Sequence, residues 1–237
     1  MTEQFIVEVA NEQHFRFAET ICAEMEASAA ARGTGIAKRS PDYVELKMQE
    51  GKAVIATTKK GEWAGFCYTE SWSHGKYVAN SGLIVAPQFR KSGLAKEIKK
   101  KIFELSRKNY PDAKIFGLTT GLAVMKINSD LGYEPVTYSE LTQDEAFWSG
   151  CKSCVNFDIL TMKERKNCLC TAMLYDPAEK KEPIQKPHFD VSKKSKPLER
   201  LMNMKRIKFL GSSSKEKLKK QLIDKHYIPA EENEEEE

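Results

Sequence analysis

The segment Gly82–Ala95 combines the end of an apolar run, a proline, a basic turn and the start of a helical pattern. Val85 ends the apolar run, Pro87 interrupts it, and helical spacing begins just after Arg90. The first backbone N–H groups of a helix have no partners within the helix, and the helix dipole is positive at that end. Such a terminus binds phosphate groups, so the turn predicts an anion site suited to a pyrophosphate. The residues of this predicted site are Arg90, Lys91, Ser92, Gly93, Leu94 and Ala95.

Two patterns in the chain resemble motifs of the GNAT N-acetyltransferase superfamily. Arg90, Gly93 and Ala95 fill the pattern Arg/Gln-x-x-Gly-x-Gly/Ala, by which that family binds pyrophosphate. The segment Ala123–Tyr133 is similar to the family's later helix-to-strand junction, which typically ends Leu-Gly-Phe/Tyr. The resemblance covers about residues 1–140. It implies an enzyme that transfers an acyl group from acyl-coenzyme A to an amine.

The resemblance also implies where the donor, acetyl-coenzyme A, binds. In the family the fourth strand diverges from the fifth, and the pantetheine arm of the cofactor enters the gap. Backbone groups near Ile84 and Val85 would then hold the pantetheine amides, and a backbone N–H at the same place would stabilise the oxyanion. The acceptor amine attacks the thioester directly, without a covalent enzyme intermediate.

The acid and the base of such a reaction are harder to assign. Many family members carry a tyrosine four residues before the glycine of the junction, where it protonates the departing thiolate, and this chain has Asn128 there. Asparagine hydrogen-bonds but is no acid at neutral pH, and Tyr133 and Tyr138 are the alternatives. Glu70 and His74, after the third expected strand, are the candidate bases for the attacking ammonium.

Basic residues between the first two expected helices predict the chemistry of the acceptor. Arg32 and Arg39 lie in a segment that also holds two glycines. Because a guanidinium suits two-point recognition of a carboxylate, we expect a small acidic amine such as an amino acid. A loose resemblance to small family members linked with arginine biosynthesis points to glutamate. The alternatives are ordinary surface cations at this segment and, for the whole chain, a module that senses acyl-coenzyme A without turnover.

Four cysteines fall within residues 151–170. Cys151 and Cys154 form a C-x2-C pair, and Cys168 and Cys170 form a C-x-C pair. Zinc prefers four thiolates in a tetrahedron, so this spacing predicts a closed, structural zinc site, and four unligated thiols are the alternative. Disulfides are not expected in a reducing compartment.

The elements that would position these residues alternate in type along the first 140 residues. β-rich runs predict strands at residues 4–9, 52–57, 62–69, 77–85, 114–119 and 133–139. Helical spacing and caps predict helices at residues 12–31, 41–50, 92–109 and 121–131. The sequence thus predicts an α/β (α+β) fold, a mixed sheet covered by helices, which is the GNAT acyl-CoA N-acyltransferase fold that the resemblance implies.

Three segments are expected along the chain: a GNAT domain at 1–140, a Cys-rich segment at 141–177 and a mostly disordered tail at 178–237. Residues 1–177 hold 23 basic and 22 acidic side chains, residues 178–230 hold 15 and 6, and residues 231–237 add six acids. The basic character belongs to the tail. The charge of the main domain therefore gives no support to nucleic-acid binding.

Composition and targeting signals indicate a soluble protein. Hydrophobic residues make up 41% of the chain and charged residues 30%, and no apolar run approaches the ~20 residues of a membrane span. Residues 1–4 lack the basic and apolar regions of a secretory signal. We expect a cytoplasmic protein whose partner is a small-molecule amine, with neither a membrane nor a nucleic acid as partner. The oligomeric state is left open.

Overall fold

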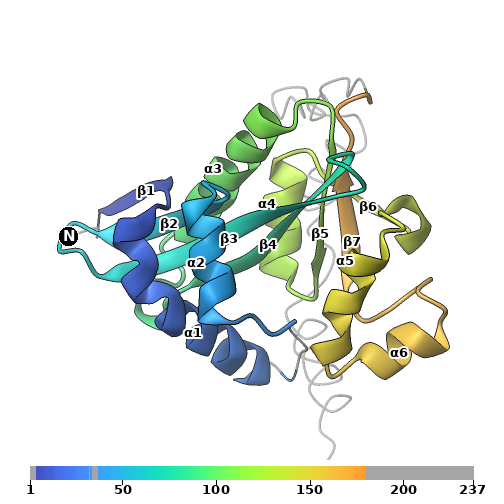
Figure 1. Ribbon diagram of the computed structural model, residues 1–237, viewed down its shortest axis with the longest axis horizontal. Coiled ribbons are helices and arrows are strands. Elements are labelled where there is room, and N and C mark those ends of the chain that lie inside the picture. Colours follow the sequence, from blue (N-terminus) through green and yellow to red (C-terminus); the bar gives the residue numbers. More distant parts are fainter. Residues whose placement is uncertain (1–3, 32, 34–36, 180–237) are drawn as a thin grey trace, which may run out of the picture. The chain divides into compact units, whose positions relative to one another are not determined.

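The computed structural model describes residues 4–31, 33 and 37–179 of the chain. It contains a seven-stranded mixed sheet with the strand order β1-β2-β3-β4-β5-β7-β6 (Figure 1). The strands are β1 (Phe5–Val9), β2 (Ala53–Thr58), β3 (Trp63–Trp72), β4 (Tyr77–Val85), β5 (Lys114–Thr119), β6 (Glu134–Val136) and β7 (Thr171–Tyr175). The α-helices are α1 (Ala18–Ala31), α2 (Pro41–Gln49), α3 (Leu94–Asn109), α4 (Leu122–Asp130), α5 (Glu145–Ser149) and α6 (Phe157–Met162).

Neighbouring strands run antiparallel except at one place. β1 to β4 form an antiparallel meander, β4 and β5 are parallel, and β7 is antiparallel to both β5 and β6. The parallel pair needs a crossover connection, which α3 supplies. β4 and β5 pair only at Tyr77–Ala79 and Lys114–Phe116, although β4 continues to Val85 and β5 to Thr119. The two strands therefore diverge beyond Ala79.

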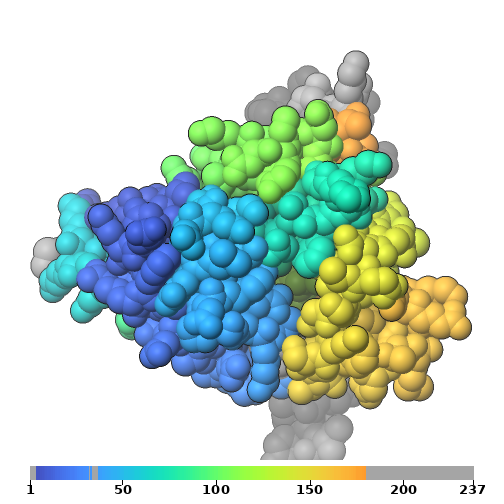
Figure 2. Space-filling model, in the orientation of Figure 1, coloured from blue at the N-terminus to red at the C-terminus, as the bar shows by residue number. Residues whose placement is uncertain are grey.

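Helices cover both faces of the sheet, and the alternation of side chains assigns each helix to a face. α1 and α2 pack on the face that carries Phe66 and Tyr68, whereas α3 packs on the face that carries Cys67. α4 lies with α3 behind the sheet, and α5 and α6 lie with α1 and α2 in front of it (Figure 1). Figure 2 shows the front helices as two groups, α1 and α2 in blue and the α5–α6 segment in yellow. The divergence of β4 and β5 is thus flanked by two differently built faces.

A bulge in β4 requires a glycine. The register of β3 against β4 shifts between Phe66 and Tyr68, which leaves an extra residue in β4. Gly82 has a φ of 66°, and a Cβ on it would lie 2.7 Å from the Tyr68 ring and 2.8 Å from Met25. Because any side chain at Gly82 would be strained and would clash, the bulge depends on this glycine. It lies past Ala79, in the part of β4 that has left β5.

Most of the predicted elements are confirmed within a few residues. The helix cap predicted at Ser40 is present, since its hydroxyl accepts a hydrogen bond from Tyr43 N and Pro41 begins α2. The last predicted strand is shorter than expected. β6 ends at Val136 because Thr137 forms a capping box that starts the 3-10 turn Tyr138–Glu140.

The expected boundary at residue 140 falls inside this sheet. Residues 141–177 contain α5, α6 and β7, and β7 lies between β5 and β6. The sequence analysis does not predict β7. Its three central residues are all buried, so its sequence lacks the alternation of apolar and polar residues by which a strand is recognised. The tail expected from residue 178 lies outside the described residues from Lys180 onward. Within the described part of the chain, no helix has both the length and the apolar character that crossing a membrane requires.

Candidate active site

The turn between β4 and α3, where the sequence predicts an anion site, has an irregular backbone. It runs through the short 3-10 helix Pro87–Phe89, and Lys91 and Gly93 have positive φ angles of 65° and 90°. The Ser92 hydroxyl donates to the Phe89 carbonyl at 2.7 Å and fixes the turn. α3 begins at Leu94 with Gly93 as its N-cap, which has no side chain to accept from the first turn, although Leu94 N donates to Ser92 Oγ at 3.4 Å. Nothing lies within 4 Å of a Cβ placed on Gly93, and Lys91, Ser92 and Gly93 are exposed, so the turn before α3 is open to solvent.

The two basic side chains of the turn differ in their surroundings. The Arg90 guanidinium forms an ion pair with Glu24 at 2.6 Å and donates to Ser28 Oγ at 2.7 Å and to the Val85 carbonyl at 3.2 Å. Arg90 therefore ties the turn to α1, and Glu24 balances its charge. Lys91 is exposed. The binding of a cofactor by either side chain stays a prediction, and Lys91 is the better placed of the two.

Ile84 and Val85 lie at the end of β4, on the edge that β5 has left. Both pair with β3 on their other edge, opposite Phe66 and Gly65. The pairing of β4 with β5 ends at Ala79, so a chain that entered the gap would meet backbone donors and acceptors of β4. This is the arrangement that the family resemblance implies for a pantetheine arm. The assignment of Ile84 and Val85 to that arm remains a prediction.

A buried polar network closes the narrow end of the divergence on the α3 face. The Asn80 side chain accepts a hydrogen bond from the Tyr133 hydroxyl at 2.9 Å and donates to Ser106 Oγ at 2.8 Å. Burial raises the pKa of Tyr133 well above its ordinary value, so its hydroxyl stays protonated. Tyr138, the other alternative acid, donates to the Cys170 carbonyl at 2.8 Å. Both tyrosine hydroxyls are thus engaged within the fold.

Asn128 of α4 lies next to this network and is 1% exposed. Its Nδ2 lies 3.7 Å from Met173 Sδ, whereas its Oδ1 is buried without a hydrogen-bond partner among the described residues. A Cβ on Gly117, the first residue of β5 beyond the paired ones, would lie 4.0 Å from Asn128 Nδ2 and 3.7 Å from the Asn80 carbonyl. An orphaned buried acceptor is rare in proteins. Here it stands beside the divergence, where the amide or thiol donors of a coenzyme A arm would satisfy it, so the residues present fit this cofactor.

On the opposite face, Glu70 of β3 is held by two side chains of α2. Lys47 Nζ lies 2.8 Å from Glu70 Oε2, and the Tyr43 hydroxyl donates to the same oxygen. Lys47 also pairs with Glu50 at 3.3 Å. In the sheet, Glu70 stands opposite Ala79, the last residue of β4 that pairs with β5. Glu70 therefore lies at the narrow end of the divergence on the α2 face, where a base for an acceptor amine is expected.

Arg39 joins this cluster from the segment before α2. Its Nε donates to the Tyr68 hydroxyl at 2.6 Å, and its guanidinium lies 5.5 Å from the centroid of the Tyr43 ring. Burial alone lowers the pKa of Arg39, but Tyr68, Tyr43 and Glu70 together reverse that effect and raise it. Arg39 therefore stays cationic. Arg32, the other predicted acceptor residue, lies outside the described residues.

Tyr43, Lys47 and Tyr68 belong to this cluster but were not predicted. Tyr43 and Lys47 are four residues apart on α2, which puts them on one side of the helix. Tyr68 precedes Glu70 by two residues in β3, so the two share a face of the sheet. These two spacings are the features of the sequence from which the cluster could have been predicted. The other candidate base, His74, is exposed in the turn between β3 and β4, and the structure does not bring it to Glu70.

The four late cysteines, Cys151, Cys154, Cys168 and Cys170, line one small cavity, and all four are free thiols. Burial, together with the neighbouring thiols, raises the pKa of Cys170 to about 12 and also raises that of Cys151. Within residues 4–31, 33 and 37–179, no group of three or more His, Cys, Asp or Glu side chains has the arrangement to hold a metal ion. The thiols therefore converge as the spacing suggests, but they do not form a finished zinc site as they stand.

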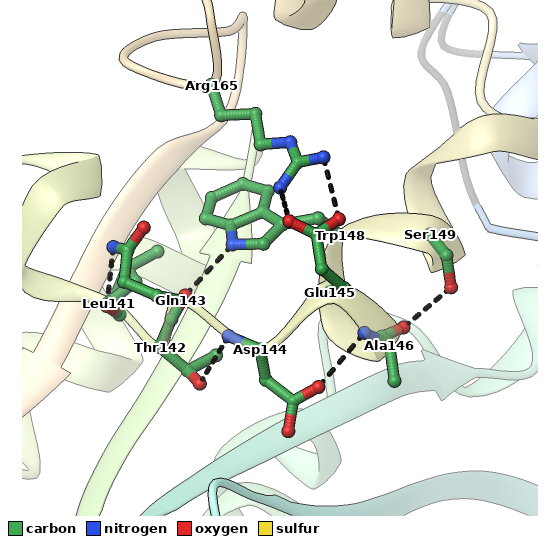
Figure 3. A network of polar contacts seen from close by, with 9 residues as sticks. All are labelled: Leu141, Thr142, Gln143, Asp144, Glu145, Ala146, Trp148, Ser149 and Arg165. Carbon is green, nitrogen blue, oxygen red and sulfur yellow. Dashed lines mark hydrogen bonds and ion pairs between the residues drawn. The ribbon is translucent and has the colours of Figure 1, made fainter.

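The segment that carries these cysteines is braced by its own side chains (Figure 3). Trp148 Nε1 donates to the Thr142 carbonyl at 2.9 Å, and the Asp144 carboxylate caps the N-terminus of α5. Arg165, beyond α6, reaches back to Glu145 with Nη2 at 2.8 Å from Oε2. Trp148 also lines the cysteine cavity. The cavity is thus built into an ordered part of the fold.

Comparison with known proteins extends this description. No family model matches the chain, and no curated protein matches its sequence. N-acetylglutamate synthase from Neisseria gonorrhoeae, solved with coenzyme A and N-acetylglutamate, matches with a TM-score of 0.53 and 15% identity over 74% of this chain and 36% of that one. An acetyltransferase of the GNAT family from Staphylococcus aureus matches with a TM-score of 0.52 and 11% identity over 73% of this chain and 99% of that one.

A third similar structure is the diaminobutyrate acetyltransferase EctA from Paenibacillus lautus, solved with 2,4-diaminobutyric acid and coenzyme A. It has a TM-score of 0.50 and 9% identity over 76% of this chain and 99% of that one. This chain covers only 36% of the length of the synthase, but nearly the whole of the other two. At these identities the likeness shows the fold, and it confirms the fold class that the sequence predicts. The chain has the GNAT acetyltransferase fold.

Proposed function

We propose that this chain is an N-acyltransferase that moves an acetyl or similar acyl group from acyl-coenzyme A to the amine of a small molecule. The divergence of β4 from β5 carries the proposal, because the two halves of the candidate site meet there. The anion-binding turn continues from the open end of β4, and Glu70 lies on the α2 face at the narrow end. A cofactor arm that follows β4 inward from the turn would bring its thioester toward Glu70.

The donor side of the site is built from backbone. Acyl-coenzyme A supplies the acyl group as an activated thioester. Its pyrophosphate would bind at the N-terminus of α3 beside Lys91, and its pantetheine arm along Ile84 and Val85. The bulge at Gly82 leaves a residue of β4 without a partner in β3, so a backbone N–H there is available to stabilise the oxyanion.

The acceptor side is built from side chains. Glu70 takes a proton from the acceptor ammonium, and the free amine then attacks the thioester carbon. A C–N bond forms, the C–S bond breaks, and its electron pair leaves with the sulfur as a thiolate. The proton that the new amide nitrogen sheds is then taken up by this thiolate, which leaves as the coenzyme A thiol. Tyr43 and Lys47 both hold Glu70 by Oε2, which leaves Oε1 to receive the proton.

Asn128 stands where many members of the resembled family carry a tyrosine that acts as the acid. Its amide has no acidic proton at neutral pH, so it serves to hydrogen-bond the arm or the sulfur. A coenzyme A thiolate is a fair leaving group, and the reaction does not depend on an acid at this place. Asn128 is therefore proposed as a binding residue of the donor side.

The charge of the acceptor side favours a small acidic amine such as a glutamate-like amino acid. Lys47 is balanced by Glu70 and Glu50, whereas Arg39 is held by a tyrosine hydroxyl and two aromatic rings. Within the described part of the chain, no carboxylate forms an ion pair with Arg39. A substrate carboxylate would supply that missing charge through the planar guanidinium. Two of the similar structures were solved with amino-acid-derived ligands, N-acetylglutamate and 2,4-diaminobutyric acid.

The proposal is tested by the release of the coenzyme A thiol from acetyl-coenzyme A in the presence of different amines. The panel holds acidic, neutral and basic amino acids and polyamines. We expect turnover with an acidic amino acid to exceed turnover with the other classes. Preference for a basic amine would overturn the argument from Arg39 while leaving the enzyme in place. Tight binding of coenzyme A without turnover on any amine would instead favour the module that senses acyl-coenzyme A.

A further inference from the structure

Four thiols from two stretches of chain meet beneath α5 and α6. Cys151 and Cys154 come from the turn after α5, and Cys168 and Cys170 come from the loop that leads into β7. All four line one cavity of about 30 Å³. Thus both halves of the predicted C-x2-C and C-x-C pattern face the same small space.

The walls of the cavity suit a soft ion better than water or an apolar ligand. Apart from the thiols and Asn156, its walls are apolar or aromatic side chains, namely Leu118, Tyr138, Trp148, Phe157 and Leu160. A buried water needs two to four polar partners, which these walls do not offer well, although the volume exceeds the ~10–15 Å³ that one water requires. An organic ligand needs hundreds of cubic ångströms. One small ion with an affinity for sulfur fits both the size and the chemistry.

The present arrangement is an open form of such a site. Zinc–sulfur bonds are about 2.3 Å long, so four ligating sulfurs crowd around one point. No three of these side chains have that arrangement in the described residues, and the thiols would have to turn inward by rotation about their side-chain bonds. The backbone of Asn156 already joins the two halves of the pattern, because its N donates to Cys154 Sγ at 3.5 Å and its carbonyl accepts from Cys168 Sγ at 3.8 Å.

We propose that Cys151, Cys154, Cys168 and Cys170 bind one zinc-class metal ion in this cavity. All four positions of a tetrahedral ion are then filled by protein, so the site is structural and leaves no place for a substrate or an attacking water. It lies beside the acceptor side, since Ser153, between two of the ligands, accepts a hydrogen bond from Lys38 N at 3.0 Å. The bound ion therefore holds the chain that leads directly into Arg39.

The experiment measures metal by itself and does not depend on any enzymatic activity. The full-length protein is purified without chelators and its metal content and free thiols are counted. It is then reduced, stripped with a chelator and titrated with Zn²⁺ alone in competition with a chromophoric chelator. We expect one equivalent of zinc bound with a dissociation constant below about 0.1 µM, six free thiols after denaturation, and release of protons on binding.

Two variants separate ligation from folding. The double variant Cys168→Ala/Cys170→Ala removes half of the ligands and should weaken zinc binding by at least about 100-fold, beyond the 10–100-fold typical of outer-shell changes. Cys22→Ala removes a buried thiol of the α1 core and should leave zinc binding unchanged. If the double variant does not fold, as judged by circular dichroism, the single variant Cys154→Ser takes its place. Zinc binding weaker than about 10 µM, fewer than six free thiols because of a disulfide, or equal loss in Cys22→Ala would each overturn the proposal.

Discussion

Two buried lysines, one on each face of the sheet, show how differently the two sides of the site are built. Lys47 of α2 is 5% exposed and pairs with Glu70 at 2.8 Å and Glu50 at 3.3 Å. Lys99 of α3 is 2% exposed, and among the described residues no carboxylate pairs with it. It lies 5.2 Å from the centroid of the Tyr133 ring. Burial lowers the pKa of Lys99 to about 8, and Cys67 opposes that shift only in part.

The two faces of the sheet thus differ in how their charged side chains are paired. On the α2 face, charged and hydroxyl groups gather at Glu70, where we propose that they take a proton from the acceptor and bind its charge. The proposed donor side relies mainly on backbone atoms of the turn at Gly93 and of the diverging β4. Changes to side chains should therefore damage the acceptor side most, whereas the donor side should respond to changes in backbone shape and charge.

The largest effect is expected from Glu70→Gln, which keeps the shape and the hydrogen bond from Tyr43 but removes the base. We expect kcat/KM for the acceptor to fall by about 10²–10⁴ while the affinity for coenzyme A is unchanged. Steady-state kinetics and coenzyme A titration measure the two quantities. Glu62→Gln, in the exposed turn between β2 and β3, is the matched control. A loss of less than threefold would place the base elsewhere.

Arg39→Gln tests whether the acceptor side reads a carboxylate. The loss of one charge-assisted contact is worth about 1.5–3 kcal/mol, so KM for an acidic acceptor should rise by roughly 10–100-fold. KM for acetyl-coenzyme A should not change, because Arg39 contacts Tyr68 and Tyr43 and not the residues of the donor turn. Lys38→Gln removes the neighbouring exposed cation as a control. Equal effects on acidic and neutral acceptors would show that Arg39 only supports Tyr68.

Lys99→Met tests the unpaired charge on the α3 face. The folded-state pKa of Lys99, about 8, lies below its ordinary value of 10.5, so the unfolded chain binds more protons between these pH values. The stability of the protein should therefore rise with pH across this window, and the cost of the buried charge is fully present below pH 8.

Urea unfolding at two pH values measures this effect. Between pH 7.5 and 9.5 the wild-type protein should gain about 2 kcal/mol relative to Lys99→Met, in which the charge is absent. Taking the difference cancels the titration of groups that do not interact with Lys99. Cys67 does interact with Lys99, but burial raises the pKa of its thiol to about 11, so in the folded protein it stays protonated across this pH range. Equal pH profiles for the two proteins would mean that Lys99 finds a partner or water in solution.

Asn128→Leu is expected to have the smallest effect. It should leave stability unchanged or raise it, but it should weaken the binding of coenzyme A. Leucine has nearly the same size and removes the buried Oδ1 that lacks a partner, so the melting temperature should stay level or rise. The affinity for coenzyme A should fall by about 2–10-fold, the value of one neutral hydrogen bond. Differential scanning calorimetry and titration with coenzyme A measure the pair. A lower melting temperature with unchanged affinity would make Asn128 a structural residue only.

The elements of this fold that could be predicted from the sequence are those that depend on residues close together in the chain. Each of three features is recognisable from a few consecutive residues: the cap at Ser40, the hairpin of β2 and β3, and the glycine turn before α3. β7 does not, because a strand inserted between two others is recognised by its partners and not by its own pattern. For the same reason residues 141–177 were predicted as a separate Cys-rich segment, although they supply β7, which lies between β5 and β6 in the sheet.

The candidate site divides in the same way. The geometry of the turn before α3 was predictable because its residues are consecutive, whereas its binding of the donor stays a prediction. The acceptor cluster combines Arg39, the helical pair Tyr43 and Lys47, and the strand pair Tyr68 and Glu70, which meet only in three dimensions. His74 is the opposite case, since it is close to Glu70 in sequence but lies in an exposed turn.

The most direct test of the account is a calorimetric titration of the protein with coenzyme A, run beside Gly93→Glu and Gly93→Ala. Both variants place a side chain at a φ of 90° and share its strain, but only glutamate adds a negative charge at the N-terminus of α3. We predict one bound equivalent for the wild type, an affinity about 100-fold weaker for Gly93→Glu, and a much smaller change for Gly93→Ala. Failure of the wild-type protein to bind coenzyme A, or equal losses in the two variants, would contradict the account.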